Sequence, residues 1–284
     1  MPFDALIGAA AGCVTTLPLV SKWRLGVRRA LPVVALLALP AAAAAAAIGA
    51  LAPLGGGAVA ALAWLLTLMF AGAAAVRRFY RDPERQPPAA DDVIVSPADG
   101  EVLYVRESSG GVLPVADKHG RHYPLHELTK TTLARGDAVV VGVGLSLLDV
   151  HVNRAPIAGR ITVLRRFPGR FGSLRRPEMV FENERATMVI ERGRLQIAVV
   201  MIASRLVRRI VAFIAEGEEV TAGQRLGMIR FGSQVDLVLP LREGLLVTVR
   251  PGERVRAGES IVAVRTRRAV ERVGEPARGV VSGR

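Results

Sequence analysis

Apolar residues are distributed unevenly, and their pattern separates a membrane-like first part of the chain from a strand-like second part. No charged residue lies between Arg29 and Arg77. A single helix over this stretch would extend roughly 70 Å at ~1.5 Å per residue, more than twice the ~30 Å hydrocarbon core of a bilayer. The Pro-Leu-Gly-Gly-Gly interruption at Pro53–Gly57 therefore predicts a hairpin of two membrane-spanning helices, at about residues 30–52 and 58–76.

Basic residues flank the predicted hairpin on both sides. They are Lys22, Arg24, Arg28 and Arg29 before it, and Arg77, Arg78 and Arg81 after it. Because positively charged flanks stay on the cytoplasmic side of a membrane, we expect residues 1–80 to anchor the protein in the cell membrane and residues 81–284 to form a cytoplasmic domain. The alternatives are a buried Ala-rich hairpin and a cleaved signal peptide, which would place its basic residues ahead of a shorter apolar run.

From Val93 onward, short runs of Val, Ile and Leu separated by Gly and Pro predict a mostly β domain. Residues 217–229 and 252–264 align without gaps, each beginning Gly-Glu-x-Val-x-Ala-Gly. A second pair, Pro97–Val102 and Pro156–Ile161, shares the pattern Pro-x-x-Gly-x-Val/Ile. Each unit is typical of a turn leading into a strand. Such units resemble the barrel-sandwich hybrid fold of lipoyl and biotinyl domains.

Lysine usage tests whether this is a carrier domain. The chain contains only Lys22, Lys118 and Lys130. None lies in a Gly-Glu-x-Val-x-Ala-Gly repeat, which disfavours a biotin or lipoate carrier because such a carrier needs an acceptor lysine there. Enzymes that use pyridoxal phosphate also hold their cofactor through a lysine Schiff base. If this protein acts on amines, its electrophile therefore has to come from another source.

The net charge narrows the class of partner. The chain has 38 Lys and Arg against 25 Asp and Glu, a balance of +13 that indicates an anionic partner, either nucleic acid or a membrane surface. Three Tyr and two Trp offer few platforms for stacking bases, and the Arg residues are scattered. A membrane surface is therefore the favoured anionic partner.

The single cysteine, Cys13, excludes an intramolecular disulfide.

Four strings bring together residues of chemical interest. They are Phe79–Arg85 (Phe-Tyr-Arg-Asp-Pro-Glu-Arg), Ser96–Val102 (Ser-Pro-Ala-Asp-Gly-Glu-Val), Asp149–Pro156 (Asp-Val-His-Val-Asn-Arg-Ala-Pro) and Phe231–Asp236 (Phe-Gly-Ser-Gln-Val-Asp). In this order, with Glu182–Arg185 and Ala203–Ile210 between them, they resemble the phosphatidylserine decarboxylase family, in particular its short membrane-anchored form. The resemblance covers about residues 77–264. It implies a lyase that converts phosphatidylserine to phosphatidylethanolamine in phospholipid biosynthesis.

The resemblance also implies a zymogen that cuts its own chain between Gly232 and Ser233. Attack of the Ser233 hydroxyl on the preceding carbonyl would give an ester, and β-elimination followed by hydrolysis would leave a pyruvoyl group and ammonia. Gly232 would let the backbone adopt the strained turn that this attack requires. The covalent pyruvoyl group would replace pyridoxal phosphate and form the Schiff base with the substrate amine. Residues 1–232 and 233–284 would then form a heterodimer.

Two further residues are candidates for catalysis. His151 lies in the third string, and an imidazole that titrates near neutrality suits a base during cleavage and an acid during protonation of the carbanion. Asp99 is its expected partner, in the manner of a triad with Ser233 as nucleophile. Longer family members carry two histidines in the third string, and Arg154 stands where the second would be. The division of roles between Asp99 and His151 is therefore left open.

Two other groups of polar residues are weaker candidates for a functional site. His119, His122 and His126 lie close together in a polar loop that we interpret as solvated, and we predict no metal site. Arg154, Arg205, Arg208 or Arg209 could pair with the lipid phosphate, or could form a solvated basic face. The alternative functions are decarboxylation of another serine lipid such as archaetidylserine, or a noncatalytic membrane-bound β-sandwich adaptor.

Overall fold

The computed structural model describes residues 2–22, 27–52, 54–116, 122–130, 137–170, 172–174, 179–203, 210–229, 233–241 and 244–265. The chain divides into two compact units. The first comprises Met1–Asp82 together with Ser146–Val150, and the second comprises Pro83–Leu145 and His151–Arg284.

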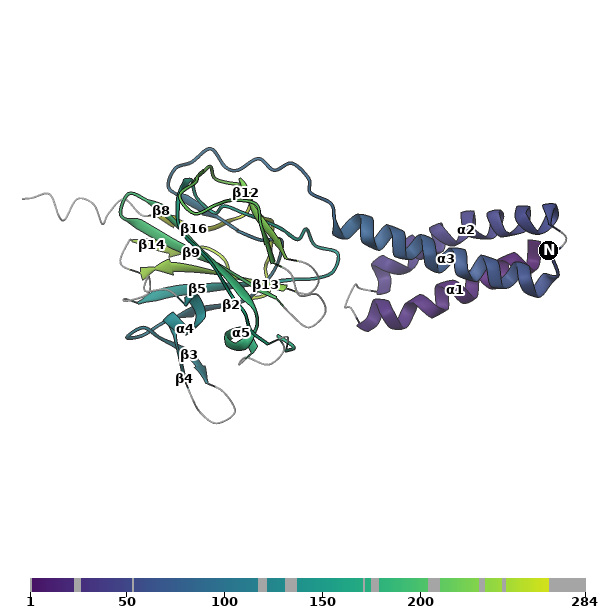
Figure 1. Ribbon diagram of the computed structural model, residues 1–284, viewed down its shortest axis with the longest axis horizontal. Helices are drawn as coiled ribbons and strands as arrows, with labels where there is room; N and C mark the ends of the chain where they lie inside the picture. The colour runs from purple at the N-terminus through teal and green to yellow at the C-terminus, as the bar shows by residue number, and fades with distance from the viewer. Residues whose placement is uncertain are drawn as a thin grey trace, which may run out of the picture. The chain divides into compact units, whose positions relative to one another are not determined.

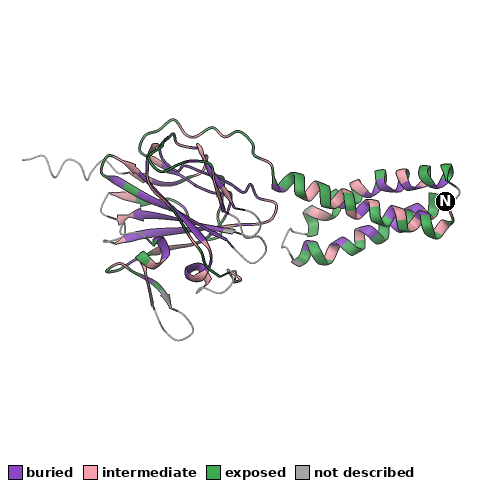
Figure 2. Ribbon diagram, in the orientation of Figure 1, coloured by how far each residue is buried: buried purple, intermediate pink, exposed green. Residues whose placement is uncertain are grey.

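Three apolar helices make up most of the first unit: α1 (Pro2–Lys22), α2 (Val27–Leu51) and α3 (Gly56–Phe79). Each is long and apolar enough to cross a membrane. Residues buried between the helices are mostly small, while many large apolar residues of the same helices are exposed, so each helix alternates between buried and exposed positions (Figure 2). The buried ones include Ala5, Ala9, Ala42, Ala45 and Ala63, and the exposed ones include Phe3, Leu36, Leu39, Leu51 and Leu65. Lipid tails would cover such an outer surface.

The helix α1 has no counterpart in the hairpin that the sequence predicts. It lies against α3 so closely that Gly8 and Gly12 leave no room for a side chain: a Cβ added at Gly12 would lie 2.7 Å from Cβ of Thr67, and one at Gly8 would overlap the carbonyl of Ala60. The Trp64 indole N–H donates to Thr15 Oγ1 over 3.3 Å. Because Gly8 faces Ala60 and Gly12 faces Thr67 further along α3, α1 and α3 run parallel (Figure 1).

The second unit is built on antiparallel sheets. The largest has eight strands in the order β11 (Glu219–Val220), β7 (Gly159–Phe167), β8 (Arg185–Arg192), β9 (Leu195–Ala203), β13 (Ser233–Pro240), β5 (Ala138–Leu145), β2 (Gly100–Glu107) and β15 (Arg254–Val255). Every pair of neighbours in it is antiparallel. The strands β9 and β13 lie side by side near its middle (Figure 1). Apolar helices followed by antiparallel sheets confirm the predicted class at this level.

Smaller elements surround the large sheet. Three-stranded sheets have the orders β1 (Val93–Val95), β16 (Ile261–Arg265), β14 (Leu245–Val247) and β10 (Ile210–Ala212), β12 (Arg225–Ile229), β6 (Val152–Arg154). A hairpin joins β3 (Val112–Ala116) to β4 (His122–Pro124), and two short helices are α4 (Leu125–Thr129) and α5 (Met179–Glu182).

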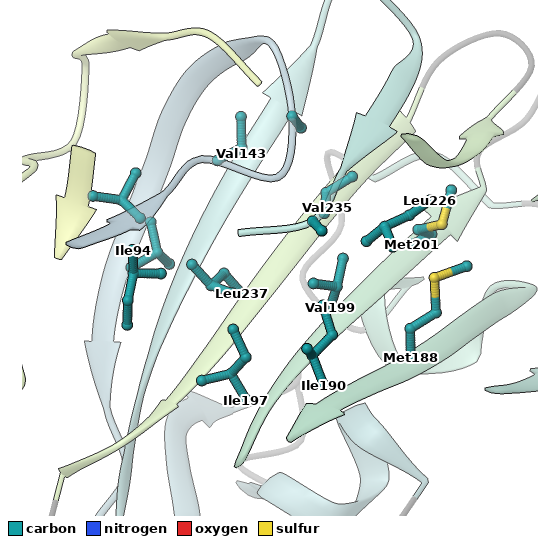
Figure 3. Close-up of a cluster of buried hydrophobic side chains, with 14 of the residues drawn as sticks. Ile94, Val143, Met188, Ile190, Ile197, Val199, Met201, Leu226, Val235 and Leu237 are labelled. Atoms are coloured by element: carbon teal, nitrogen blue, oxygen red, sulfur yellow. The ribbon is translucent and has the colours of Figure 1, made fainter. Parts of the chain in front are cut away.

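The central strands are buried on both faces, which explains their nearly continuous apolar sequences. On one face, alternate residues such as Val143, Val199, Val235 and Leu237 point into the main core (Figure 3). The residues between them pack into a second cluster with Leu125, Leu128, Val180 and Phe181 of the short helices. Side chains alternate between the faces of a strand, so a strand between two apolar layers reads as an unbroken apolar run.

The two sequence repeats occupy equivalent places at opposite edges of the large sheet. The edge strand β11 pairs Val220 with Gly159 of β7, and β15 pairs Val255 with Gly100 of β2. The turns before these strands begin at Gly217 and Gly252, both with a φ of +91°, a backbone conformation that side chains rarely adopt. The repeated glycines therefore mark a repeated turn-and-strand structure.

Candidate active site

Residue Ser233 begins β13, which lies between two neighbours in the large sheet. Its backbone pairs with Leu145 at the end of β5 and with Ala203 at the end of β9. A strand held on both sides fixes the main chain at this residue. The preceding Phe231 and Gly232 lie outside the described residues.

His151 is completely buried and lies just before β6. Its carbonyl oxygen accepts a hydrogen bond from the N–H of Ile229 over 3.3 Å. Ile229 ends β12, and Ser233 begins the next strand along the chain. The tertiary structure therefore ties the predicted base to one end of the short segment that contains the Gly232-Ser233 pair.

Asp99 is held by an ion pair that the sequence did not predict. Its Oδ2 lies 2.8 Å from Nη2 of Arg85, and both side chains are about nine-tenths buried. Its Oδ1 accepts the N–H of Ala257 over 2.7 Å. The other Arg85 amine donates to Glu259 Oε2 over 2.9 Å. This carboxylate therefore joins the segment after α3 to the second Gly-Glu-x-Val-x-Ala-Gly repeat.

Backbone hydrogen bonds connect the turn that carries Asp99 to β6. The carbonyl of Pro97 accepts the N–H of Arg154 over 2.9 Å and the Asn153 side-chain amide over 3.4 Å. In the reverse direction, Val95 N–H donates to the carbonyl of Pro156 over 3.0 Å. The two Pro-x-x-Gly turns thus support each other, and these bonds connect the turn that carries Asp99 to the strand that follows His151. Their direct pairing stays a prediction.

Arg154 is buried and binds main-chain carbonyls. Its Nη1 donates to Gly223 and its Nη2 to Pro83, each over 2.9 Å. Through these contacts its guanidinium joins Pro83, where the second unit begins, to the turn before β12 within that unit. The other arginines considered for a lipid phosphate, Arg205, Arg208 and Arg209, lie outside the described residues.

Asn183 supports the strand beside Ser233, a role that its place in a motif string did not indicate. Its Nδ2 donates to the carbonyls of Ala203 and Gly172, each over 3.0 Å, and its Oδ1 accepts the N–H of Gly172 over 2.8 Å. The side chain is fully buried. Because Ala203 pairs with Ser233, Asn183 fixes the end of the neighbouring strand.

A buried polar cluster follows Ser233 on β13. The Asp236 carboxylate accepts hydrogen bonds from Tyr104 Oη over 2.8 Å and from Gln234 Nε2 over 2.7 Å. Burial raises the pKa of Asp236 to about 6, against the opposing effects of these hydrogen bonds and of the Arg106 and Arg185 charges. Apart from the position of Asp236 in the last string, no sequence pattern indicated this cluster.

The described histidines and lysines around the polar loop do not form a metal or cofactor site. His126 is exposed, while the side chain of His122 and the whole of His119 lie outside the described part. In the described part of the chain, no group of three His, Cys, Asp or Glu side chains could hold a metal ion. Lys130 is exposed and forms an ion pair with Glu127 over 2.6 Å, whereas Lys118 lies outside the described residues.

Comparison with known proteins identifies first the class of enzyme and then the family to which this chain belongs. A putative archaetidylserine decarboxylase proenzyme of Methanothermobacter thermautotrophicus is 40% identical over 196 residues, which cover 69% of this chain and 83% of that protein. Phosphatidylserine decarboxylase proenzymes of Symbiobacterium thermophilum and Erythrobacter litoralis are 37% and 39% identical, covering 72% and 71% of this chain and 90% and 76% of theirs. All three are decarboxylase proenzymes.

The family model described as phosphatidylserine decarboxylase matches residues 73–263. This chain belongs to the phosphatidylserine decarboxylase family, and it is an enzyme of that class. The match includes all four strings on which the resemblance rested.

Proposed function

We propose that this chain is a zymogen that cuts itself between Gly232 and Ser233 and then decarboxylates phosphatidylserine to phosphatidylethanolamine. The observation that carries the proposal is the family match over residues 73–263, which includes the Gly-Ser pair at the start of the central strand β13. In the mature enzyme, residues 1–232 and 233–284 stay together as a heterodimer, because β13 pairs on both sides with strands of the long chain.

The residues present fit a pyruvoyl group better than a pyridoxal cofactor. Ser233, its precursor, has a main chain fixed between two strands, whereas Lys130 is exposed and paired with a carboxylate. When formed, the pyruvoyl group supplies a carbonyl that draws electrons from the bond to the departing carbon dioxide. No added cofactor is then needed.

Cleavage uses the chain's own atoms. The Ser233 hydroxyl oxygen attacks the Gly232 carbonyl carbon, the peptide C–N bond breaks, and the residue 233 nitrogen becomes a free amine. Loss of the residue 233 Cα proton then breaks its Cβ–O bond, leaving a Gly232 carboxylate and a dehydroalanine. Water converts the dehydroalanine to a pyruvoyl group and releases ammonia. His151 takes the hydroxyl proton in the first step and later protonates the product carbon.

Asp99 supports His151 in this scheme. Its ion pair with Arg85 and its hydrogen bond from the Ala257 N–H hold the Pro97–Gly100 turn in place. That turn is itself hydrogen-bonded to β6, which follows His151. A carboxylate that also reaches the imidazole would fix its tautomer and raise its basicity. Both routes make Asp99 a supporting group, with His151 as the acid and base.

The experiment that tests the proposal is an intact mass measurement on purified protein. Wild-type protein should separate into chains of 232 and 52 residues, the shorter one without a free amino terminus. A Ser233→Ala variant should remain one chain of 284 residues without decarboxylase activity, because alanine has no oxygen for the attack. Turnover of phosphatidylserine by an intact wild-type chain would falsify the mechanism.

A second substrate deserves a direct test because two kinds of relative are similarly identical. The putative archaetidylserine decarboxylase proenzymes share 40% identity with this chain, and the phosphatidylserine decarboxylase proenzymes share 37% and 39%. Both lipids present a serine headgroup, so the same chemistry would serve either. Turnover of each in matched detergent micelles distinguishes them, and preference for the archaetidyl lipid would replace phosphatidylserine as the substrate.

We infer that the second unit works at the cytoplasmic face and that all three helices cross the membrane. The basic residues lie at and around the α1–α2 connection and at the end of α3, whereas the α2–α3 connection has none and Asp4 lies near the start of α1. Positive flanks favour the cytoplasm, so the start of α1 would face the other side. In a Cys13→Ala background, Phe3→Cys should react with an impermeant maleimide on intact cells and Val27→Cys should not. The reverse labelling would overturn this topology.

The repeated turns also support a more specific fold assignment. Two Gly-x-x-Val-x-x-Gly turns at opposite sheet edges and two mutually bonded Pro-x-x-Gly turns are the features expected of a barrel-sandwich hybrid. We assign the second unit to that architecture, and an experimental structure of the mature enzyme would test the assignment.

A further inference from the structure

Three side chains form a closed hydrogen-bonded ring directly after the proposed cleavage point. Gln234 Nε2 donates to Asp236 Oδ1 over 2.7 Å and to Tyr104 Oη over 2.6 Å, and Tyr104 Oη donates to Asp236 Oδ2 over 2.8 Å. Gln234 is 2% exposed and Asp236 is completely buried. We refer to Tyr104, Gln234 and Asp236 as the β13 ring.

The ring lies in an apolar layer that would otherwise exclude polar groups. Neighbouring strands contribute Val140, Val200 and Ile202 to that layer, and α5 contributes Val180 and Phe181. Burying a carboxylate and an amide there is unfavourable unless their hydrogen bonds are satisfied. A simpler apolar pair would fill the same space without this requirement. The ring therefore needs an explanation beyond packing.

Two arginines on β2 and β8, each two strands from β13 in the sheet, act on the ring. The Arg106 guanidinium of β2 lies 4.1 Å from the centre of the Tyr104 ring. Arg185 of β8 contributes a charge that acts on Asp236, while its Nη1 donates to the carbonyl of Glu127 over 2.8 Å. Both arginines stabilise the ionised form of Asp236, which is the form that accepts from both ring partners.

The position of the ring along β13 indicates what it holds. Gln234 is bonded to Ser233 and pairs with Gly144 of β5 and Ile202 of β9. Before cleavage, residue 233 is restrained by the chain on both sides. After cleavage it becomes the end of a strand, and strand ends fray unless something ties them down.

Building on the proposed cleavage, we propose that the β13 ring is a positioning device that keeps the new end of the short chain in register after the cut. Tyr104, Gln234 and Asp236 act through residue 233 and do not touch the substrate. Because the intact chain already restrains residue 233, the ring matters more for decarboxylation than for cleavage. Displacement of a reacting group by about 1 Å can lower a rate by about 100-fold, so loss of this restraint should lower kcat.

Near-isosteric variants test this role. Tyr104→Phe removes one member's hydroxyl, and Gln234→Met removes both amide donors. Each should still cut to the two chains, with kcat for phosphatidylserine in mixed micelles lowered at least about tenfold and KM within about twofold of wild type. Thr187→Val is the matched control: Thr187 lies on β8, two strands from β13, and its buried hydroxyl donates to the Thr129 carbonyl over 2.8 Å and not to the ring, so its loss should leave kcat unchanged.

Several outcomes would overturn the positioning role. Ring variants that still cleave themselves and keep the wild-type kcat would contradict it. A loss of kcat in Thr187→Val as large as in the ring variants would show a general packing effect. A ring variant that folds but does not cleave itself would show that the ring is needed for the cleavage step and not for holding the new end afterwards. Failure of the proposed function is separate, because then wild-type protein itself would stay uncut or inactive.

A measurement without ring variants covers the case in which they do not fold. Hydrogen exchange at the amides of residues 234–236 is compared between mature wild type and the uncut Ser233→Ala protein. A ring that holds the new end predicts protection within about threefold in the two forms. Exchange that is more than about tenfold faster in the mature enzyme would show that the end frays and that the ring does not position it.

Discussion

At the scale of single residues, buried polar groups concentrate around the start of β13. His151, Asn153, Asn183, Gln234 and Asp236 are all buried. Such groups are unfavourable in a core unless hydrogen-bonded, so their accumulation around one strand end indicates a role in chemistry or in its support. The predicted residues His151 and Ser233 belong to this neighbourhood, and Asn183 is an addition that only the structure reveals.

We expect His151→Ala to abolish decarboxylase activity while the chain still folds. The proposed mechanism needs a base near the Gly232-Ser233 pair, and removal of a general base typically lowers a rate by about 10²–10⁴-fold. Activity assays combined with circular dichroism check both parts. The exposed His126 is the matched control, and His126→Ala should retain wild-type turnover. Normal turnover in His151→Ala would remove this residue from the mechanism.

The ion pair of Asp99 yields a test of whether its role is chemical or structural. Removing either partner leaves the other charge buried, which typically destabilises a protein by about 3–5 kcal/mol. We therefore expect Asp99→Ala and Arg85→Ala each to lower the free energy of unfolding by about 3 kcal/mol and to slow maturation. If Asp99 acts only by contacting His151, Arg85→Ala would mature at the normal rate.

The pKa of Asp236 predicts a pH dependence of stability. In the folded protein it is raised from 3.8 to about 6, chiefly by burial. Between these values the folded state keeps a proton that the unfolded chain has released, so this group's contribution to stability falls as pH rises from about 4 to about 6. Melting curves in detergent should show this fall in wild type and in the exposed Asp91→Asn control. Asp236→Asn should lack it; an unchanged profile would contradict the raised pKa.

At the scale of elements, the close packing of α1 on α3 leaves no room for larger residues at the contact. Small residues let membrane helices approach each other, and no side chain fits at Gly8 or Gly12. We expect Gly8→Leu to separate the two helices and lower the melting temperature in detergent by several degrees. Gly72→Leu, at an open position of α3, is the control and should have no effect. Equal melting of both variants would mean that α1 does not pack on α3 in the folded protein.

At the scale of the whole molecule, two physical bases for membrane attachment can be separated. A net charge of +13 would hold a peripheral protein to acidic lipids, but salt screens that attraction. Apolar helices are not released by salt. We therefore expect the protein to stay in the membrane pellet after washes with 1 M salt and with alkaline carbonate, and to leave it only with detergent. Release by salt alone would identify a peripheral protein.

Much of this protein can be inferred from the sequence because the relevant signals are local. A long uncharged stretch predicts membrane-spanning helices, and glycines at fixed spacing predict the repeated turns, since both depend on a few neighbouring residues. The motif strings identified the family, and they contain the three residues predicted for catalysis, Ser233, His151 and Asp99. The predicted hairpin did not include α1, whose interrupted apolar pattern and Pro18 weakened the signal.

Contacts between distant segments required the tertiary structure. Arg85 reaches Asp99 and Glu259, Asn183 reaches the strand beside Ser233, and Tyr104 closes the ring on Gln234 and Asp236. No local pattern specifies these partners, because side chains far apart in the chain meet only when the sheet order and register are set. Residue types and spacing thus determined the kind of chemistry by themselves, whereas folding decided which groups surround it, how deeply they are buried and how Asp236 titrates.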